Sequence, residues 1–156
     1  SYRSTCEITD FAQRIRANTD LEPVARHGEK PRVLRYNNEK EELSSIKELI
    51  ATYQASTYKS LGIVCKTESQ AREMADKLQI PDIHFLSNQS TAFVQGIVIT
   101  SAHIAKGLEF DEVIIPQVDD KNYHSEIDRS MLYVAVTRAM HRLTLTYSRN
   151  KTPLFD

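Results

Sequence analysis

Strand-like and helix-like segments alternate along the chain, and this alternation constrains the fold more than any other feature of the sequence. Residues 61–65 are a continuous apolar run, as expected for a strand buried on both faces of a parallel sheet. Residues 38–53 carry apolar side chains at helical spacing, and Asn38 can cap that helix. The alternation predicts an α/β domain in which helices flank a mainly parallel sheet.

The rest of the chain follows the same pattern. We expect further helices over residues 9–17, 68–78 and 128–140, and further strands over residues 32–36, 83–86, 96–100, 113–115 and 143–147. A chain of 156 residues is long enough for one domain with a substantial core. We assign that domain to residues 1–150 and expect residues 151–156 to be a frayed tail.

The composition is that of an ordinary soluble globular protein, with 40% hydrophobic and 26% charged residues. No apolar run approaches the roughly 18 residues of a membrane span, and the two cysteines form no disulfide framework, so we expect a cytoplasmic protein without membrane contact. Since the net charge is −1, any contact with nucleic acid must be local. The histidines and cysteines lack metal-ligand spacing, and we expect the acidic stretch 119–128 to be a solvated loop.

Three short motifs carry the functional signal. Residues 132–140 read Leu-Tyr-Val-Ala-Val-Thr-Arg-Ala-Met, residues 102–111 read Ala-His-Ile-Ala-Lys-Gly-Leu-Glu-Phe-Asp, and the chain opens with Ser-Tyr-Arg-Ser. Together they resemble the late motifs of superfamily 1 DNA helicases of the UvrD and Rep kind. The phosphate loop Gly-x-x-x-x-Gly-Lys-Ser/Thr, which belongs to the early motifs, is absent from this sequence. The chain therefore resembles half of an ATP-driven motor.

The resemblance implies the second RecA-like domain, usually called 2A, of a larger helicase. It implies that ATP and Mg²⁺ are held mainly by a first RecA-like domain of the same polypeptide. It also implies that this domain contacts single-stranded DNA. We expect the full-length protein to be an ATP-dependent DNA helicase. We expect the domain alone to be inactive, since it lacks the phosphate loop.

On the nucleotide side, the resemblance assigns Arg138 and Arg3 to the γ-phosphate of ATP. An arginine finger in this position contributes roughly 10³–10⁵ in rate, because its planar fork stays charged and binds two phosphate oxygens. Glu109 is assigned to the ribose, and Gly107 permits a tight or positive-φ turn before it. A single arginine such as Arg138 would more often form an ion pair with an acidic residue on the surface of the same domain. The whole motif around it favours the phosphate contact instead.

On the DNA side, the resemblance assigns Thr100, Ser101 and His103 to the single strand. Lys106 either reaches a phosphate or steadies the turn. Lys66 stands where the family more often has Arg. For this lysine, a contact with the DNA backbone and a surface position without a function are equally favoured.

One departure from UvrD and Rep concerns the large helical insertion that those proteins carry between the Lys66 and Lys106 segments. No such insertion fits between these two segments. In this respect the chain is similar to the helicase IV or HelD-type branch, some members of which act on RNA polymerase. The alternative function is therefore a docking module for RNA polymerase that does not unwind DNA. The sequence leaves open the translocation polarity, DNA or RNA preference, oligomeric state, and whether the insertion is naturally missing.

Overall fold

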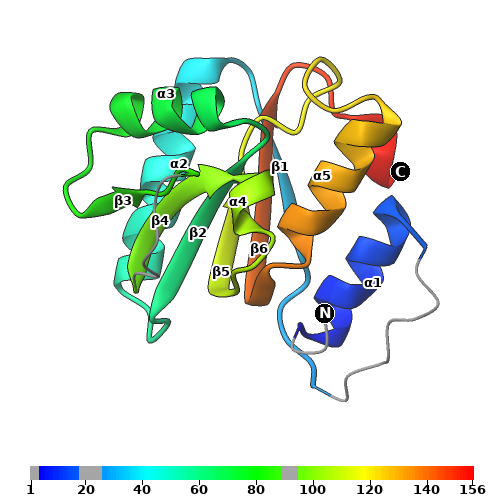
Figure 1. Cartoon of the computed structure of the whole chain (residues 1–156), viewed down its shortest axis with the longest axis horizontal. Coiled ribbons are helices and arrows are strands. Elements are labelled where there is room, and N and C mark those ends of the chain that lie inside the picture. Colours follow the sequence, from blue (N-terminus) through cyan, green and yellow to red (C-terminus); the bar gives the residue numbers. More distant parts are fainter. Residues whose placement is uncertain (1–3, 18–25, 89–94) are drawn as a thin grey trace.

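A parallel sheet forms the centre of the computed structural model, which describes residues 4–17, 26–88 and 95–156 (Figure 1). Within these residues the sheet has six strands in the order β1-β6-β5-β2-β4-β3, and every pairing is parallel. The strands are β1 (Arg32–Tyr36), β2 (Ser60–Cys65), β3 (Ile83–Phe85), β4 (Gly96–Ser101), β5 (Phe110–Ile115) and β6 (Ala139–Ser148). The predicted α/β class with a mainly parallel sheet is confirmed.

Helices cover both faces of the sheet and divide the core into two clusters. Helices α2 (Glu39–Gln54) and α3 (Glu68–Leu78) pack on one face, around Ile63 and Ile99 of the sheet. Helices α1 (Cys6–Ile15), α4 (Ala102–Ala105) and α5 (Glu126–Val136) pack on the other, around Val98 and Val113. The result is a three-layer arrangement in which α4 and α5 lie side by side (Figure 1).

Side-chain caps fix where the helices begin. Asn38, Thr67 and Ser125 each accept a hydrogen bond from a backbone N–H three residues later, at 2.9, 3.2 and 3.1 Å. The first helix begins at Cys6, three residues before the predicted start, because Thr5 is its N-cap. It ends at Ile15, two residues before the predicted end.

The helix predicted over residues 128–140 is α5, and the prediction was wrong about its end. The helix stops at Val136, where the Thr137 hydroxyl donates back to the carbonyls of Tyr133 and Val134 at 3.0 Å each. The carbonyl of Arg138 then accepts the Phe110 N–H at 2.9 Å, so the following residues join the sheet as β6. Pairing with β5 outweighs the local helical pattern.

The prediction of a frayed tail was also wrong, because the last residues pack against the domain. Pro153–Phe155 form a short 3₁₀ helix whose Leu154 and Phe155 are buried. The Phe155 ring lies 5.4 Å from the ring of Phe11 on α1. Burial of two apolar side chains outweighs the entropy that would otherwise fray the terminus.

In the part of the chain that the structure describes, no helix combines the length and apolarity needed to cross a membrane. Nor do its His, Cys, Asp and Glu side chains gather into a group that could hold a metal ion. Cys65 is buried in the core, and this burial raises the pKa of its thiol to about 12, as expected for an inert structural cysteine.

Candidate functional site

Arg138 joins the two sequence motifs that lie thirty residues apart. Its Nη1 donates to the carbonyl oxygens of Lys106 at 2.7 Å and Leu108 at 3.2 Å, and its Nε donates to Val134 at 3.2 Å. These partners are neutral oxygens, so the bonds orient the guanidinium without neutralising its charge. Burial lowers the pKa of Arg138 and the nearby Glu109 carboxylate opposes that shift, but an arginine remains protonated in proteins.

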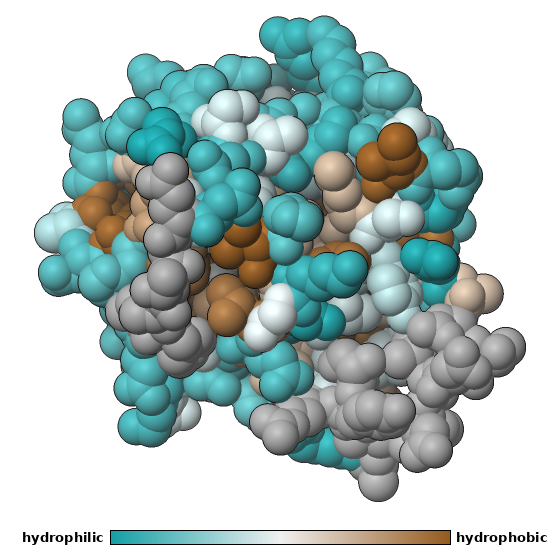
Figure 2. Space-filling model, in the orientation of Figure 1, coloured by the Kyte–Doolittle hydropathy of each residue, from teal (hydrophilic) through white to brown (hydrophobic). Residues whose placement is uncertain are grey.

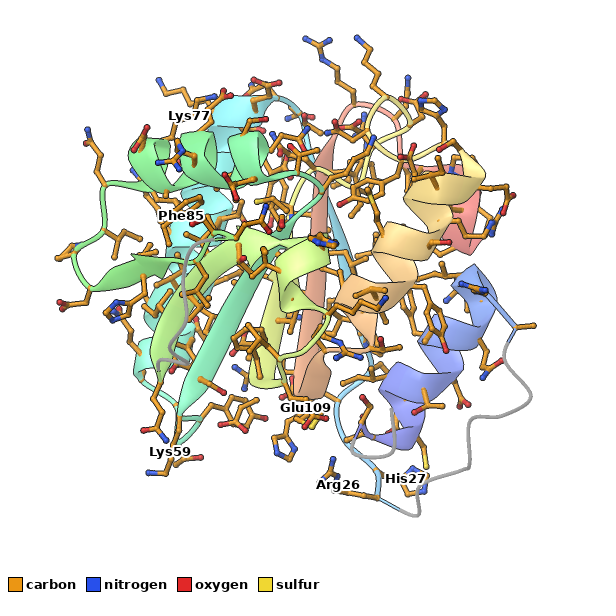
Figure 3. All side chains as sticks on the ribbon, in the orientation of Figure 1. Arg26, His27, Lys59, Lys77, Phe85 and Glu109 are labelled. Atoms are coloured by element: carbon orange, nitrogen blue, oxygen red, sulfur yellow. The ribbon has the colours of Figure 1, made fainter. Side chains whose placement is uncertain are left out.

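Glu109 lies beside Arg138 at the amino-terminal edge of the sheet. It is exposed and directly precedes β5, and Figure 3 shows it near the starts of β5 and β6. The bond from the Phe110 N–H to the Arg138 carbonyl holds the two strand starts together. The structure therefore brings together Arg138, Glu109 and the turn at Lys106.

Gly107 forms the tight turn that the sequence suggested, since the Leu108 N–H bonds to the Ala105 carbonyl at 2.9 Å. Its φ is not positive, and a Cβ added there would meet no atom within 4 Å. The fold itself does not require glycine at this position. The open space lies next to the carbonyls that hold Arg138.

Arg3 lies outside the described residues, so its assignment to the γ-phosphate stays a prediction. The neighbouring Ser4 is buried, and its hydroxyl donates to the carbonyl of Ala139 at 2.7 Å. Thr5 continues this contact, with its N–H 3.3 Å from the Met140 carbonyl. The segment that follows Arg3 is therefore held against the start of β6.

The predicted DNA-side residues divide into buried and exposed pairs. Thr100 is fully buried and donates its hydroxyl to the Leu86 carbonyl at 2.8 Å, while buried Ser101 caps α4 by accepting the Ile104 N–H at 3.4 Å. His103 and Lys106 are exposed. They line a pocket of about 160 Å³ between α4 and α5, together with Ala102, Ser130, Met131 and Val134. Only the exposed pair offers side chains to a strand in this conformation.

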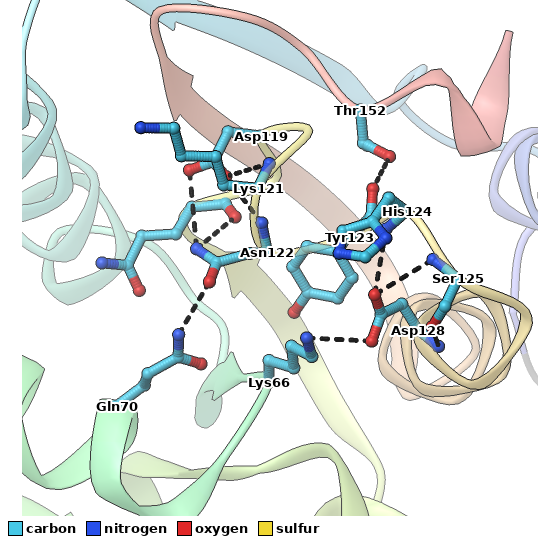
Figure 4. A network of polar contacts seen from close by, with 11 residues as sticks. Lys66, Gln70, Asp119, Lys121, Asn122, Tyr123, His124, Ser125, Asp128 and Thr152 are labelled. Atoms are coloured by element: carbon cyan, nitrogen blue, oxygen red, sulfur yellow. Dashed lines mark hydrogen bonds and ion pairs between the residues drawn. The ribbon is translucent and has the colours of Figure 1, made fainter.

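Lys66, the remaining DNA-side candidate, is held in an ion pair at the carboxyl end of β2. Its Nζ lies 2.9 Å from Oδ1 of Asp128, and the two side chains are 21% and 6% exposed (Figure 4). Asp128 was expected in a solvated loop. That prediction was wrong, because Asp128 is buried in the first turn of α5. The pattern Ser125-x-x-Asp128 signals a capping box and is the sequence feature that locates it.

Comparison with known proteins finds a helicase family that matches part of this chain. Residues 96–146 match the family described as UvrD-like helicase C-terminal domain, and they contain both motifs that meet at Arg138. This segment of the chain is therefore similar to UvrD-like helicase C-terminal domains.

Two helicases of known sequence are similar to part of this chain. DNA helicase II of Escherichia coli (strain K12) is 33% identical over 73 residues, which cover 40% of this chain and 10% of that protein. ATP-dependent DNA helicase UvrD2 of Mycobacterium tuberculosis (strain H37Rv) is 34% identical over 73 residues, with coverages of 38% and 10%. The chain thus spans about a tenth of the length of these helicases. The closeness to the HelD-type branch stays a prediction.

Two solved structures share the fold of this chain. The C-terminal domain of a possible DNA helicase from Lactobacillus plantarum WCFS1 has a TM-score of 0.82 and 29% identity, over 99% of this chain and 92% of that one. The UvsW helicase from bacteriophage T4 has a TM-score of 0.52 and 12% identity over 74% and 46%, and shares the fold alone. The predicted RecA-like fold is confirmed.

Proposed function

We propose that this chain is the second motor domain of an ATP-dependent DNA helicase, within a longer polypeptide that also contains a first RecA-like domain. Its homology to UvrD-like C-terminal domains supports the family and the reaction class. The absence of a phosphate loop supports a division of the ATP site between two domains. Residues 1–150 would form the core of this domain, and residues 151–156 would complete its packing.

The observation that carries the proposal is the placement of Arg138. Its guanidinium is held by the carbonyls of Lys106 and Leu108, with Glu109 beside it. Charge held on neutral, fixed partners suits an anion that arrives from another domain, because little reorganisation is needed when that anion binds. Arg138 would contact the γ-phosphate, and exposed Glu109 would accept a hydrogen bond from a ribose hydroxyl.

The mechanism follows from this division. The first RecA-like domain would hold Mg²⁺ and most of the nucleotide, and Mg²⁺ there supplies charge stabilisation for phosphoryl transfer. Arg138, together with Arg3, would draw the cleft closed when the γ-phosphate is present and release it after hydrolysis. Alternate closure and opening would change the grip on single-stranded DNA. On this domain, exposed His103 and Lys106 would meet the strand, while Thr100 and Ser101 would hold their segment in place.

The proposal is tested by measuring the ATPase activity of the full-length protein with and without single-stranded DNA. Arg138→Ala should lower the stimulated rate by about 10³-fold, the lower end of the arginine-finger range. Arg35→Ala is the matched control, because Arg35 is exposed on β1 and, among the described residues, donates to the Arg149 carbonyl. A stimulated rate that Arg138→Ala leaves unchanged would exclude this role.

The alternative of an RNA polymerase docking module finds no specific support. The relatives are named as DNA helicases. Figure 2 shows a mostly hydrophilic face with separate apolar patches, whereas protein-docking surfaces more often carry one contiguous apolar patch. We therefore propose the helicase motor domain alone.

A further inference from the structure

We propose that Lys66 and Asp128 are positioning residues for Arg138, and that their ion pair sets the direction of α5 instead of leaving Lys66 to contact DNA. This inference rests on the proposed function, because it concerns how Arg138 is presented to a phosphate. It assigns Lys66 a different role from the DNA-backbone contact that the family resemblance suggested.

The Asp128 carboxylate has partners on both oxygens. Oδ1 lies 2.9 Å from the Lys66 ammonium, and Oδ2 accepts the backbone N–H groups of His124 and Ser125 at 3.0 and 3.1 Å. Burial would raise the pKa of Asp128, but these hydrogen bonds outweigh it and hold the pKa well below its usual range. The Asp128 carboxyl group is therefore ionised at neutral pH.

The Lys66 side chain is directed toward α5 and the loop before it. Its ammonium also lies 5.9 Å from the centre of the buried Tyr123 ring, at a distance suited to a cation–π contact. Four residues along the chain, Gln70 of α3 donates to the Asn122 side chain at 2.8 Å. Figure 4 shows these contacts as one network, which links the turn between β2 and α3 to the start of α5 across the edge of the sheet.

Asp128 lies in the first turn of α5, and Arg138 follows the other end of this helix by two residues. The 11 residues of α5 span about 16 Å, so a tilt of about 4° at the Asp128 end would displace the other end by about 1 Å. A misplacement of about 1 Å at a catalytic group can cost about 10²-fold in rate. Because the Arg138 bonds to Lys106 and Leu108 resist that shift, we expect an effect of about tenfold.

The test compares Lys66→Met and Lys66→Arg in the full-length protein. Lys66→Met should lower kcat for ATP at saturating single-stranded DNA by about tenfold, with the Kd for an oligothymidylate strand changed less than about twofold. Lys66→Arg keeps the charge and should restore kcat to within about twofold. The matched control is Lys77→Met, which removes an exposed lysine on α3 (Figure 3) that is paired with Glu73 of the same helix.

Two further variants separate positioning from other roles. Asp128→Asn should lower kcat in the same way as Lys66→Met, and melting temperatures show whether either variant has lost its fold. In an Arg138→Ala background Lys66→Met should have no further effect on kcat, because a positioning residue acts through the group it positions.

Three outcomes would overturn the inference. One is an unchanged kcat in Lys66→Met. Another is a tenfold weaker strand affinity with kcat intact, a loss of about 1.4 kcal/mol in binding free energy, which would mark Lys66 as a DNA contact. The third is a full additional loss in the Arg138→Ala background. If Arg138→Ala itself leaves the ATPase intact, the proposed function fails, whatever Lys66 does.

Discussion

Gly62→Ala is predicted to destabilise the domain strongly, because a side chain there meets the Phe110 ring. A Cβ added to Gly62 would lie 2.5, 2.7 and 2.8 Å from three carbon atoms of that ring. Carbon atoms in contact are normally about 3.5–4.0 Å apart, so the ring would have to move by about 1 Å. Phe110 is buried in the core, and its backbone N–H is bonded to the carbonyl of Arg138.

The expected cost follows from how little freedom the ring has. Overpacking a core by one methyl group costs about 1–3 kcal/mol, and we expect about 3 kcal/mol here because three ring atoms clash at once. Without this clash, replacing a strand glycine by alanine would stabilise the domain by about 0.5–1 kcal/mol. A measured loss of stability would therefore point to the clash. Urea unfolding of the 156-residue chain measures the free energy directly.

A second substitution tests whether the ring is the cause. Phe110→Leu shortens the side chain and should cost about 1–2 kcal/mol alone, but it should recover part of the loss when combined with Gly62→Ala. A Gly62→Ala domain within about 0.5 kcal/mol of wild type would refute this reasoning, as would strictly additive losses in the double variant.

Three further outcomes are expected. Burial, only partly offset by Arg142, raises the pKa of Glu112 from 4.5 to about 7, so its stabilising contribution is present at low pH and lost as the pH rises through about 7. In urea unfolding, Glu112→Gln should therefore be more stable than wild type at pH 8, by at most about 3 kcal/mol, and show no gain at pH 4. Phe155→Ala should cost about 3 kcal/mol in the same assay, because its ring packs on Phe11; a tail that contributes nothing would leave the midpoint unchanged. In the full-length protein, Glu109→Ala should raise the KM for ATP by about tenfold with little change in kcat, as steady-state kinetics would show; an unchanged KM would remove Glu109 from the ribose.

Local signals in the sequence were enough to predict most of the fold. The strand at residues 32–36 and the helix at residues 68–78 were predicted with their observed bounds. A cap at Asn38 and a run of β-branched and apolar residues each involve only a few neighbouring residues, so no tertiary information is needed to recognise them. The parallel arrangement then follows from the alternation of the elements.

Features that depend on distant partners were not predictable in this way. The end of α5 is set by pairing of Ala139 with Phe110 in β5, and the burial of Asp128 by Lys66, 62 positions earlier in the sequence. The partners of Arg138 are backbone carbonyls, which carry no side-chain signature in a sequence. The motifs located the candidate site, but only the structure shows that its charge is held by the chain's own main chain.

The sheet order has a consequence for how the protein is made. Strand β6 comes last along the chain, yet it lies between β1 and β5 and pairs with both. While the ribosome is still completing the domain, β1 therefore has no neighbour and β5 presents an unpaired edge, the kind of surface on which chains associate wrongly. The strand that follows Arg138 is thus also the one that joins β1 to the rest of the sheet.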